Sequence, residues 1–104
     1  MYTDTQQAIR NTLWNFMGSI MDASGYNNEN KKQTVTALMS EELCRFCKND
    51  DEKTIDINTA KPILKAAKWV LESKLMEAKF SNDTNSIKEL SLLIASFDSY
   101  INKL

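Results

Sequence analysis

The sequence predicts an all-α fold: a four-helix up-down antiparallel bundle in which residues 1–104 form a single domain. Apolar residues recur at helical spacing in four separate segments. We place these helices at residues 4–24, 29–48, 59–80 and 86–103. Only two glycines and one proline are present, which favours few turns and long elements. The connections are short and polar, and such connections are typical of antiparallel neighbours.

The first predicted helix, residues 4–24, has signals at both ends. Thr3 can cap its start, and Gln6 three residues later completes a capping box. Gly25 follows it as a left-handed stop. Its apolar stripe has 4-3-4 spacing and consists of Ile9, Leu13, Phe16 and Ile20.

The second predicted helix, residues 29–48, contains an ambiguous position in its middle. Ser40 followed by Glu41 and Glu42 is also a pattern that starts helices, because a first turn favours carboxylates. We favour one continuous helix, with a break near residue 40 as the alternative. The apolar positions of this segment are Val35, Leu38, Met39, Leu43, Phe46 and Cys47.

The third predicted helix, residues 59–80, is preceded by an extended linker whose isoleucines, Ile55 and Ile57, are expected to pack on the bundle. Pro62 falls in the first turn, where its missing N–H does no harm. The helix has a broad apolar face made by Ala60, Ile63, Leu64, Ala67, Val70, Leu71, Leu75 and Ala78. Three more apolar residues lie off that face, so this helix can contact neighbours on two sides: Trp69, Met76 and Phe80.

The fourth predicted helix, residues 86–103, has the most regular pattern in the chain. Ser86 and Glu89 form a second potential capping box. Its apolar residues repeat as a heptad, which is the pattern of helices that pair along a seam. The repeat consists of Ile87, Leu90, Ile94, Phe97, Ile101 and Leu104.

Composition favours a cytoplasmic protein. The N-terminal residues show no signal peptide, and no apolar run approaches the roughly 20 residues of a membrane span. Two cysteines fit a reducing compartment. Lysine greatly outnumbers arginine, and asparagine is common, which suggests an AT-rich bacterial or phage source. The net charge of −1 speaks against a general nucleic-acid binder, which would be strongly basic.

The residue types for most catalytic chemistry are missing, so we expect no enzyme and no cofactor. The chain has no histidine, the commonest general base and metal ligand. Two glycines cannot build a phosphate-binding loop. One motif remains, Cys44-Arg45-Phe46-Cys47. It is a weak candidate for metal or redox chemistry, since a zinc site needs four ligands and the chain offers no second pair. We interpret both cysteines as packing residues of a helix.

Two groups of residues are candidates for contact with a partner. The first combines residue types that are enriched in protein interfaces, on the first and third helices: Arg10, Trp14, Met17, Met21, Trp69 and Met76. The alternative for this group is simple core packing. The second is a basic stripe on the third helix, Lys61, Lys65 and Lys68. It could contact nucleic acid or an acidic partner, or be a solvated helix face.

These patterns favour a non-enzymatic protein-binding module that acts by surface contact. An inhibitor, an immunity-type protein, an adaptor and a chaperone all belong to this class. Two alternatives stay open. One is a nucleic-acid-associated subunit that uses the lysine stripe. The other is a homodimeric structural bundle in which the C-terminal heptad pairs between chains.

Overall fold

The computed structural model describes residues 2–25, 28–46 and 55–104. Within these ranges the chain forms an all-α four-helix bundle, as the sequence predicts. The helices are α1 (Asp4–Ala23), α2 (Glu29–Phe46), α3 (Ala60–Phe80) and α4 (Thr84–Lys103). Their bounds agree with the predicted segments to within two residues wherever both ends are described. Predicted residues 47–48 of the second helix lie outside the described residues.

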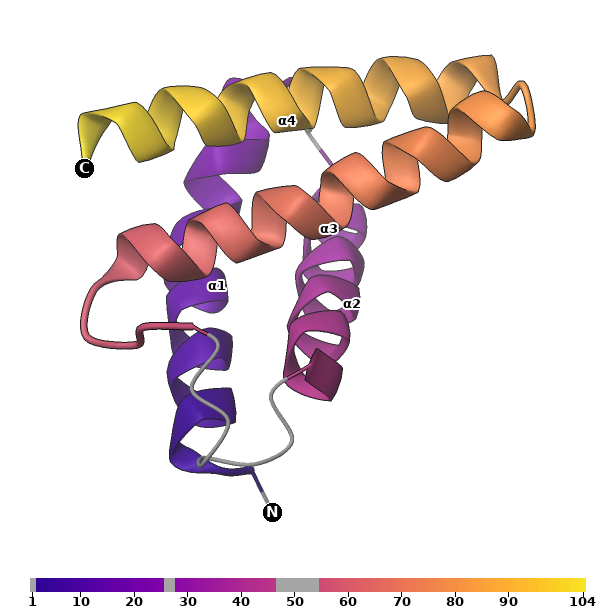
Figure 1. Cartoon of the computed structure of the whole chain (residues 1–104). Coiled ribbons are helices and arrows are strands. Elements are labelled where there is room, and N and C mark those ends of the chain that lie inside the picture. The colour runs from indigo at the N-terminus through magenta and orange to yellow at the C-terminus, as the bar shows by residue number, and fades with distance from the viewer. Residues whose placement is uncertain (1, 26–27, 47–54) are drawn as a thin grey trace.

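The four helices are arranged as two antiparallel hairpins, which Figure 1 shows lying across one another. α1 and α2 form the first hairpin, and α3 and α4 form the second. The most extensive helix contact is between α3 and α4, and α1 also touches both of them. One hairpin therefore covers the inner face of the other.

The core lies where the two hairpins meet, and every helix contributes to it. The inner face of α1 is centred on Leu13 and Met17, which are fully buried, whereas Phe16 is only partly buried. Ile55 and Ile57 of the linker pack against this core as predicted. The buried cluster consists of Ile9, Leu13, Met17, Ile20, Met21, Met39, Leu43, Cys44, Ile63, Leu64, Ala67, Val70, Leu71, Leu93, Phe97 and Ile101.

Both ends of α1 follow the signals in the sequence. The backbone N–H of Gln6 donates to the Thr3 hydroxyl at 3.1 Å, and the backbone N–H of Thr3 donates to the side-chain oxygen of Gln6 at 3.0 Å. The predicted capping box is thus formed. Gly25, with φ of 90°, adopts the left-handed conformation that ends the helix.

α2 continues without a break through residue 40, so the favoured of the two predictions is confirmed. Ser40 is fully buried at the middle of this helix instead of starting a new one. Near its start, Lys32 is also buried and donates to the carboxylates of Asp22 in α1 and Glu29. The hydrogen bond that Lys32 donates to Asp22 is the main cause that raises the pKa of Lys32. The ion pair of Lys32 with Asp22 links α2 to α1 within the first hairpin.

α4 begins two residues earlier than predicted, and its cap is a different residue. The Asp83 carboxylate accepts the Ser86 N–H at 3.2 Å and the Ser86 hydroxyl at 2.7 Å. The predicted capping box of Ser86 with Glu89 is therefore wrong. Asp83 is the N-cap residue of α4, and Ser86 donates hydrogen bonds to it. Glu89 instead pairs with Lys31 of α2 at 3.0 Å.

The turn between α3 and α4 explains the earlier start. Asn82 adopts a left-handed conformation with φ of 55°, and the Asp83 N–H donates to the Ala78 carbonyl at 3.0 Å. This closes α3 with a compact turn, and it brings Asp83 into position as the first residue that can cap α4.

Candidate protein-binding surfaces

An aromatic and basic surface lies along α1 and consists of Tyr2, Arg10 and Trp14, which we call the α1 surface. The Arg10 guanidinium lies over the Tyr2 ring, 4.3 Å from the ring centroid. Trp14 follows one helical turn after Arg10 and is 47% exposed. The cation–π contact holds the otherwise flexible Arg10 side chain against the Tyr2 ring. Both side chains are of types that are common in protein interfaces, and the contact fixes them next to each other.

The other two candidates on α1 have a different place in the structure. Met17 and Met21 are fully buried in the core and contact no solvent. They point inward because α1 turns the side that carries Leu13 and Met17 toward the second hairpin. The surface that α1 offers to a partner therefore includes Arg10 and Trp14 but neither methionine.

A second apolar surface lies on the solvent side of α3. Trp69 and Met76 are 55% and 61% exposed, and Phe80 is 86% exposed. Met76 and Phe80 line a shallow pocket together with Lys79. We call the row Trp69, Ser73, Met76 and Phe80 the α3 stripe. The residues of α3 that enter the core, such as Leu64, Ala67 and Leu71, are on the other side of the helix.

The three lysines of the predicted basic stripe are not equivalent. Lys68 pairs with Asp98 of α4 and with Glu72 at 3.7 Å. The hydrogen bond that Lys68 donates to Asp98 is the main cause that raises the pKa of Lys68. Lys65 is exposed and Lys61 is partly exposed, and neither forms an ion pair with another described residue. Within the part of the chain that the structure describes, two of the three predicted lysines are thus without an ion pair.

Cys44 is buried and lies at the contact between the start of α1 and the end of α2. Its thiol donates to the Gln6 carbonyl at 3.8 Å, and the Gln6 side-chain amide donates to the Cys44 carbonyl at 2.9 Å. Cys47, the other member of the pair, lies outside the described residues. Within the described ranges no group of three or more histidine, cysteine, aspartate or glutamate side chains could hold a metal ion.

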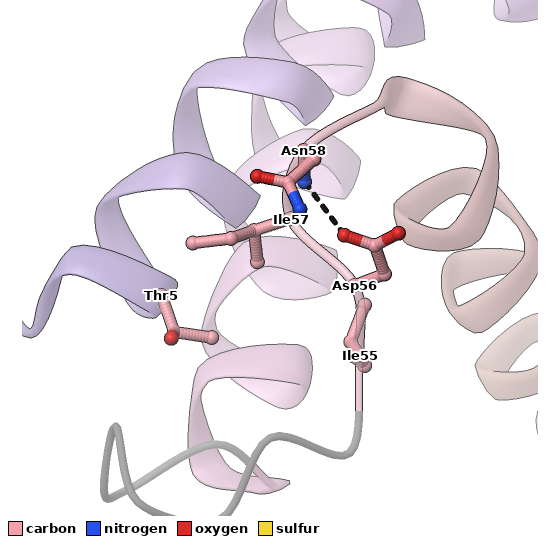
Figure 2. Close-up of a pocket in the computed structure, with 5 residues that line it drawn as sticks. All are labelled: Thr5, Ile55, Asp56, Ile57 and Asn58. Atoms are coloured by element: carbon pink, nitrogen blue, oxygen red, sulfur yellow. Dashed lines mark hydrogen bonds between the residues drawn. The ribbon is translucent and has the colours of Figure 1, made fainter.

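Figure 2 shows a pocket between the start of α1 and the linker, lined by Thr5 and by residues 55–58. The Asp56 carboxylate accepts the Asn58 N–H at 2.9 Å, which forms an Asx turn just before α3. This carboxylate, the one charged group among these lining residues, thus shapes the entry of the chain into α3.

The heptad residues of α4 are used within the chain. Phe97 and Ile101 are buried in the core, and α3 is the neighbour that α4 contacts most. Leu104 at the end of the repeat is 53% exposed. A dimer through the centre of this heptad would require the chain to give up its own core contacts.

Three residues of these surfaces, Tyr2, Ser73 and Phe80, were absent from the candidates that the sequence suggested. Tyr2 precedes the helix, so helical spacing could not place it beside Arg10. Phe80 could have been found, because its spacing from Trp69 and Met76 follows one helix face.

Comparison with known proteins finds no matching family model, no matching curated protein and no matching solved structure. None of the helices in the described ranges combines the length and the apolar character needed to cross a membrane.

Proposed function

We propose that this chain is a non-enzymatic protein-binding module that contacts a different protein through the α1 surface. The observation that carries the proposal is the half-exposed Trp14 beside the stacked pair of Arg10 and Tyr2. Tryptophan, tyrosine and arginine are the residue types most enriched among the side chains that dominate binding energy. An inhibitor, an immunity-type protein, an adaptor or a chaperone would use such a surface.

The stacking of Arg10 on Tyr2 also favours binding on entropic grounds. A free arginine loses much rotamer freedom when a partner fixes it, at roughly 0.5–1.5 kcal/mol per side chain. Arg10 is already held against a ring before any partner arrives. Trp14 adds a rigid indole with two side-chain torsions, so a partner can bury a large area at low entropic cost.

The non-enzymatic part of the proposal draws on the sequence. Without histidine, proton transfer near neutral pH would have to rely on carboxylates, lysines or thiols with strongly shifted pKa values. The shifts found at Lys32 and Lys68 stabilise their charged forms, which suits ion pairs and opposes the action of either amine as a base.

The substitution Trp14→Ala tests this proposal. Because Trp14 is half exposed, we expect the variant to keep its helical content and nearly all of its stability, but to lose its protein partner. The partner is captured from the native host on the tagged chain, with and without nuclease, and is identified by mass spectrometry. Binding of the purified partner to each variant is then measured by calorimetry, with an expected loss of at least about tenfold in affinity.

The matched control is Asn15→Ala, which changes the adjacent exposed side chain and leaves Trp14 in place. It should bind the partner as the unmodified chain does. Equal binding by Trp14→Ala and Asn15→Ala would contradict the proposal. If capture depended on the absence of nuclease, the nucleic-acid alternative, with Lys61 and Lys65 as its contacts, would replace it.

A further inference from the structure

α3 carries an apolar face on each side, and the outer one, the α3 stripe, is spaced symmetrically. Its residues follow one another at intervals of four, three and four positions. Read from either end, the intervals are the same. Two such helices can therefore be laid antiparallel, with each stripe residue opposite a stripe residue of the other copy.

The side chains along the stripe suit this antiparallel alignment. Trp69 lies opposite Phe80 of the second copy at both ends, and Ser73 lies opposite Met76 of the second copy in the middle. Small against large at the centre lets the helix axes approach closely. The Ser73 hydroxyl donates to the Trp69 carbonyl at 3.2 Å, so its polar group is already satisfied when the face becomes buried.

The charges beside the stripe are also complementary to themselves. Glu72 and Lys79 are seven residues apart and lie on the same edge of the stripe. In the antiparallel alignment, Glu72 comes to within roughly 3 Å, along the helix axis, of Lys79 of the second copy. The symmetry forms this contact twice. Lys79 has no ion pair with another described residue, and the Glu72 side chain is 48% exposed.

A parallel alignment of the same two faces is disfavoured. Glu72 and Glu77 lie on opposite edges of the stripe. In a parallel helix pair the opposite edges of the two copies meet, so Glu72 of one copy would lie beside Glu77 of the other. Like charges at such positions are destabilising. The charge pattern therefore selects the antiparallel pair.

We propose that two copies of this chain associate through the α3 stripe, with the two α3 helices antiparallel about a two-fold axis. The association uses the α3 stripe, whereas the proposed contact with a different protein uses the α1 surface. It also differs from pairing through the α4 heptad, whose central residues Phe97 and Ile101 are buried within each chain.

The expected dimer is weak. The stripe extends over about 16 Å of one helix, from Trp69 to Phe80. An interface of this size lies at the low end of specific interfaces, for which micromolar dissociation constants are typical. The oligomeric state must therefore be followed across a range of protein concentrations.

Sedimentation velocity over concentrations from about 1 μM to 1 mM tests the proposal. The unmodified chain should shift from its monomer mass of 11.9 kDa toward twice that value as the concentration rises. Glu72→Lys and Lys79→Glu should each raise the dissociation constant about tenfold or more, because each replaces two attractive contacts with two repulsive ones. An equimolar mixture of the two variants should dimerise as the unmodified chain does, since both contacts between unlike variants are attractive.

Circular dichroism and thermal unfolding of each variant separate a loss of pairing from a loss of folding. Lys79→Glu is the safer of the two, because Glu72 also pairs with Lys68 at 3.7 Å. A monomer mass at all concentrations would overturn the proposal, and so would a mixture that stays monomeric while both variants are folded. Tighter dimerisation of Glu72→Lys would indicate parallel pairing and would also overturn it. None of these results tests the proposed binding of a different protein to the α1 surface.

Discussion

Gln6 joins two parts of the molecule with one side chain. Its carbonyl oxygen accepts the Thr3 N–H at 3.0 Å, and its amide group donates to the Cys44 carbonyl at the end of α2 at 2.9 Å. The first bond closes the capping box that the sequence predicts. The second could not be predicted, because helical spacing within one segment says nothing about which carbonyl of another helix will lie nearby.

We expect Gln6→Ala to lower the free energy of unfolding by about 1–2 kcal/mol, since both side-chain hydrogen bonds of Gln6 are lost. Urea unfolding measures the change. Gln7→Ala is the matched control, because the Gln7 side chain donates to exposed Asn11 in the same helix, at 3.0 Å. The control should cost at most about 0.5 kcal/mol. Equal losses for the two variants would show that the contact with Cys44 contributes nothing.

Two buried serines differ in how their hydroxyl groups are satisfied. The Ser96 hydroxyl of α4 donates to the Ile20 carbonyl of α1 at 2.6 Å. The Ser40 hydroxyl has no hydrogen-bond partner within the part of the chain that the structure describes. A buried hydroxyl without a partner loses its bonds to water and gains none in return.

We therefore expect serine-to-alanine substitutions at these two positions to have opposite signs. Ser40→Ala should raise the free energy of unfolding by up to about 1 kcal/mol, because it removes an unsatisfied group and places a stronger helix former in α2. Ser96→Ala should lower it by about 1 kcal/mol. Thermal and urea unfolding of the two variants provide the comparison, and a destabilised Ser40→Ala would contradict this account.

At the scale of the element, the start of α4 depends on one carboxylate. The hydroxyl and backbone N–H of Ser86 donate to Asp83, and these bonds lower the pKa of Asp83 below its ordinary value of 3.8. A carboxyl group whose pKa is lower in the folded state than in the unfolded state contributes its full stabilisation at pH values above the unfolded-state pKa. That stability is lost as the pH falls through the folded pKa, below 3.8.

We expect Asp83→Ala to lower Tm by a few degrees at pH 7, because α4 loses its cap. Asp83→Asn should stay close to the unmodified chain at pH 7, since asparagine also caps helices. As the pH falls below 3.8, the difference between Asp83→Ala and the unmodified chain should shrink, whereas the asparagine variant should keep its advantage. Calorimetry as a function of pH measures this. An unchanged difference at low pH would rule out a charged cap.

The same element shows where local pattern stops being decisive. Aspartate and serine are both good caps, so the sequence around residues 83–86 allows more than one start for the helix. The turn at the end of α3 determines which of them caps the helix, because the left-handed conformation of Asn82 fixes the path of the chain into Asp83. Glu89, which the local pattern assigns to a capping box, is instead used by Lys31 of α2.

At the scale of the whole molecule, the sequence determined that four helices form and where they lie. Periodic apolar residues, the Thr3 cap and Gly25 act within a few residues of one another, so they can be recognised without a fold. Only the tertiary structure decided how the two hairpins cross and which apolar side chains lie outside. Met17 and Trp14 are both apolar residues of one helix, yet one is buried and the other half exposed. The physical reason is that burial depends on the position of neighbouring helices, and those contacts join residues far apart in the chain.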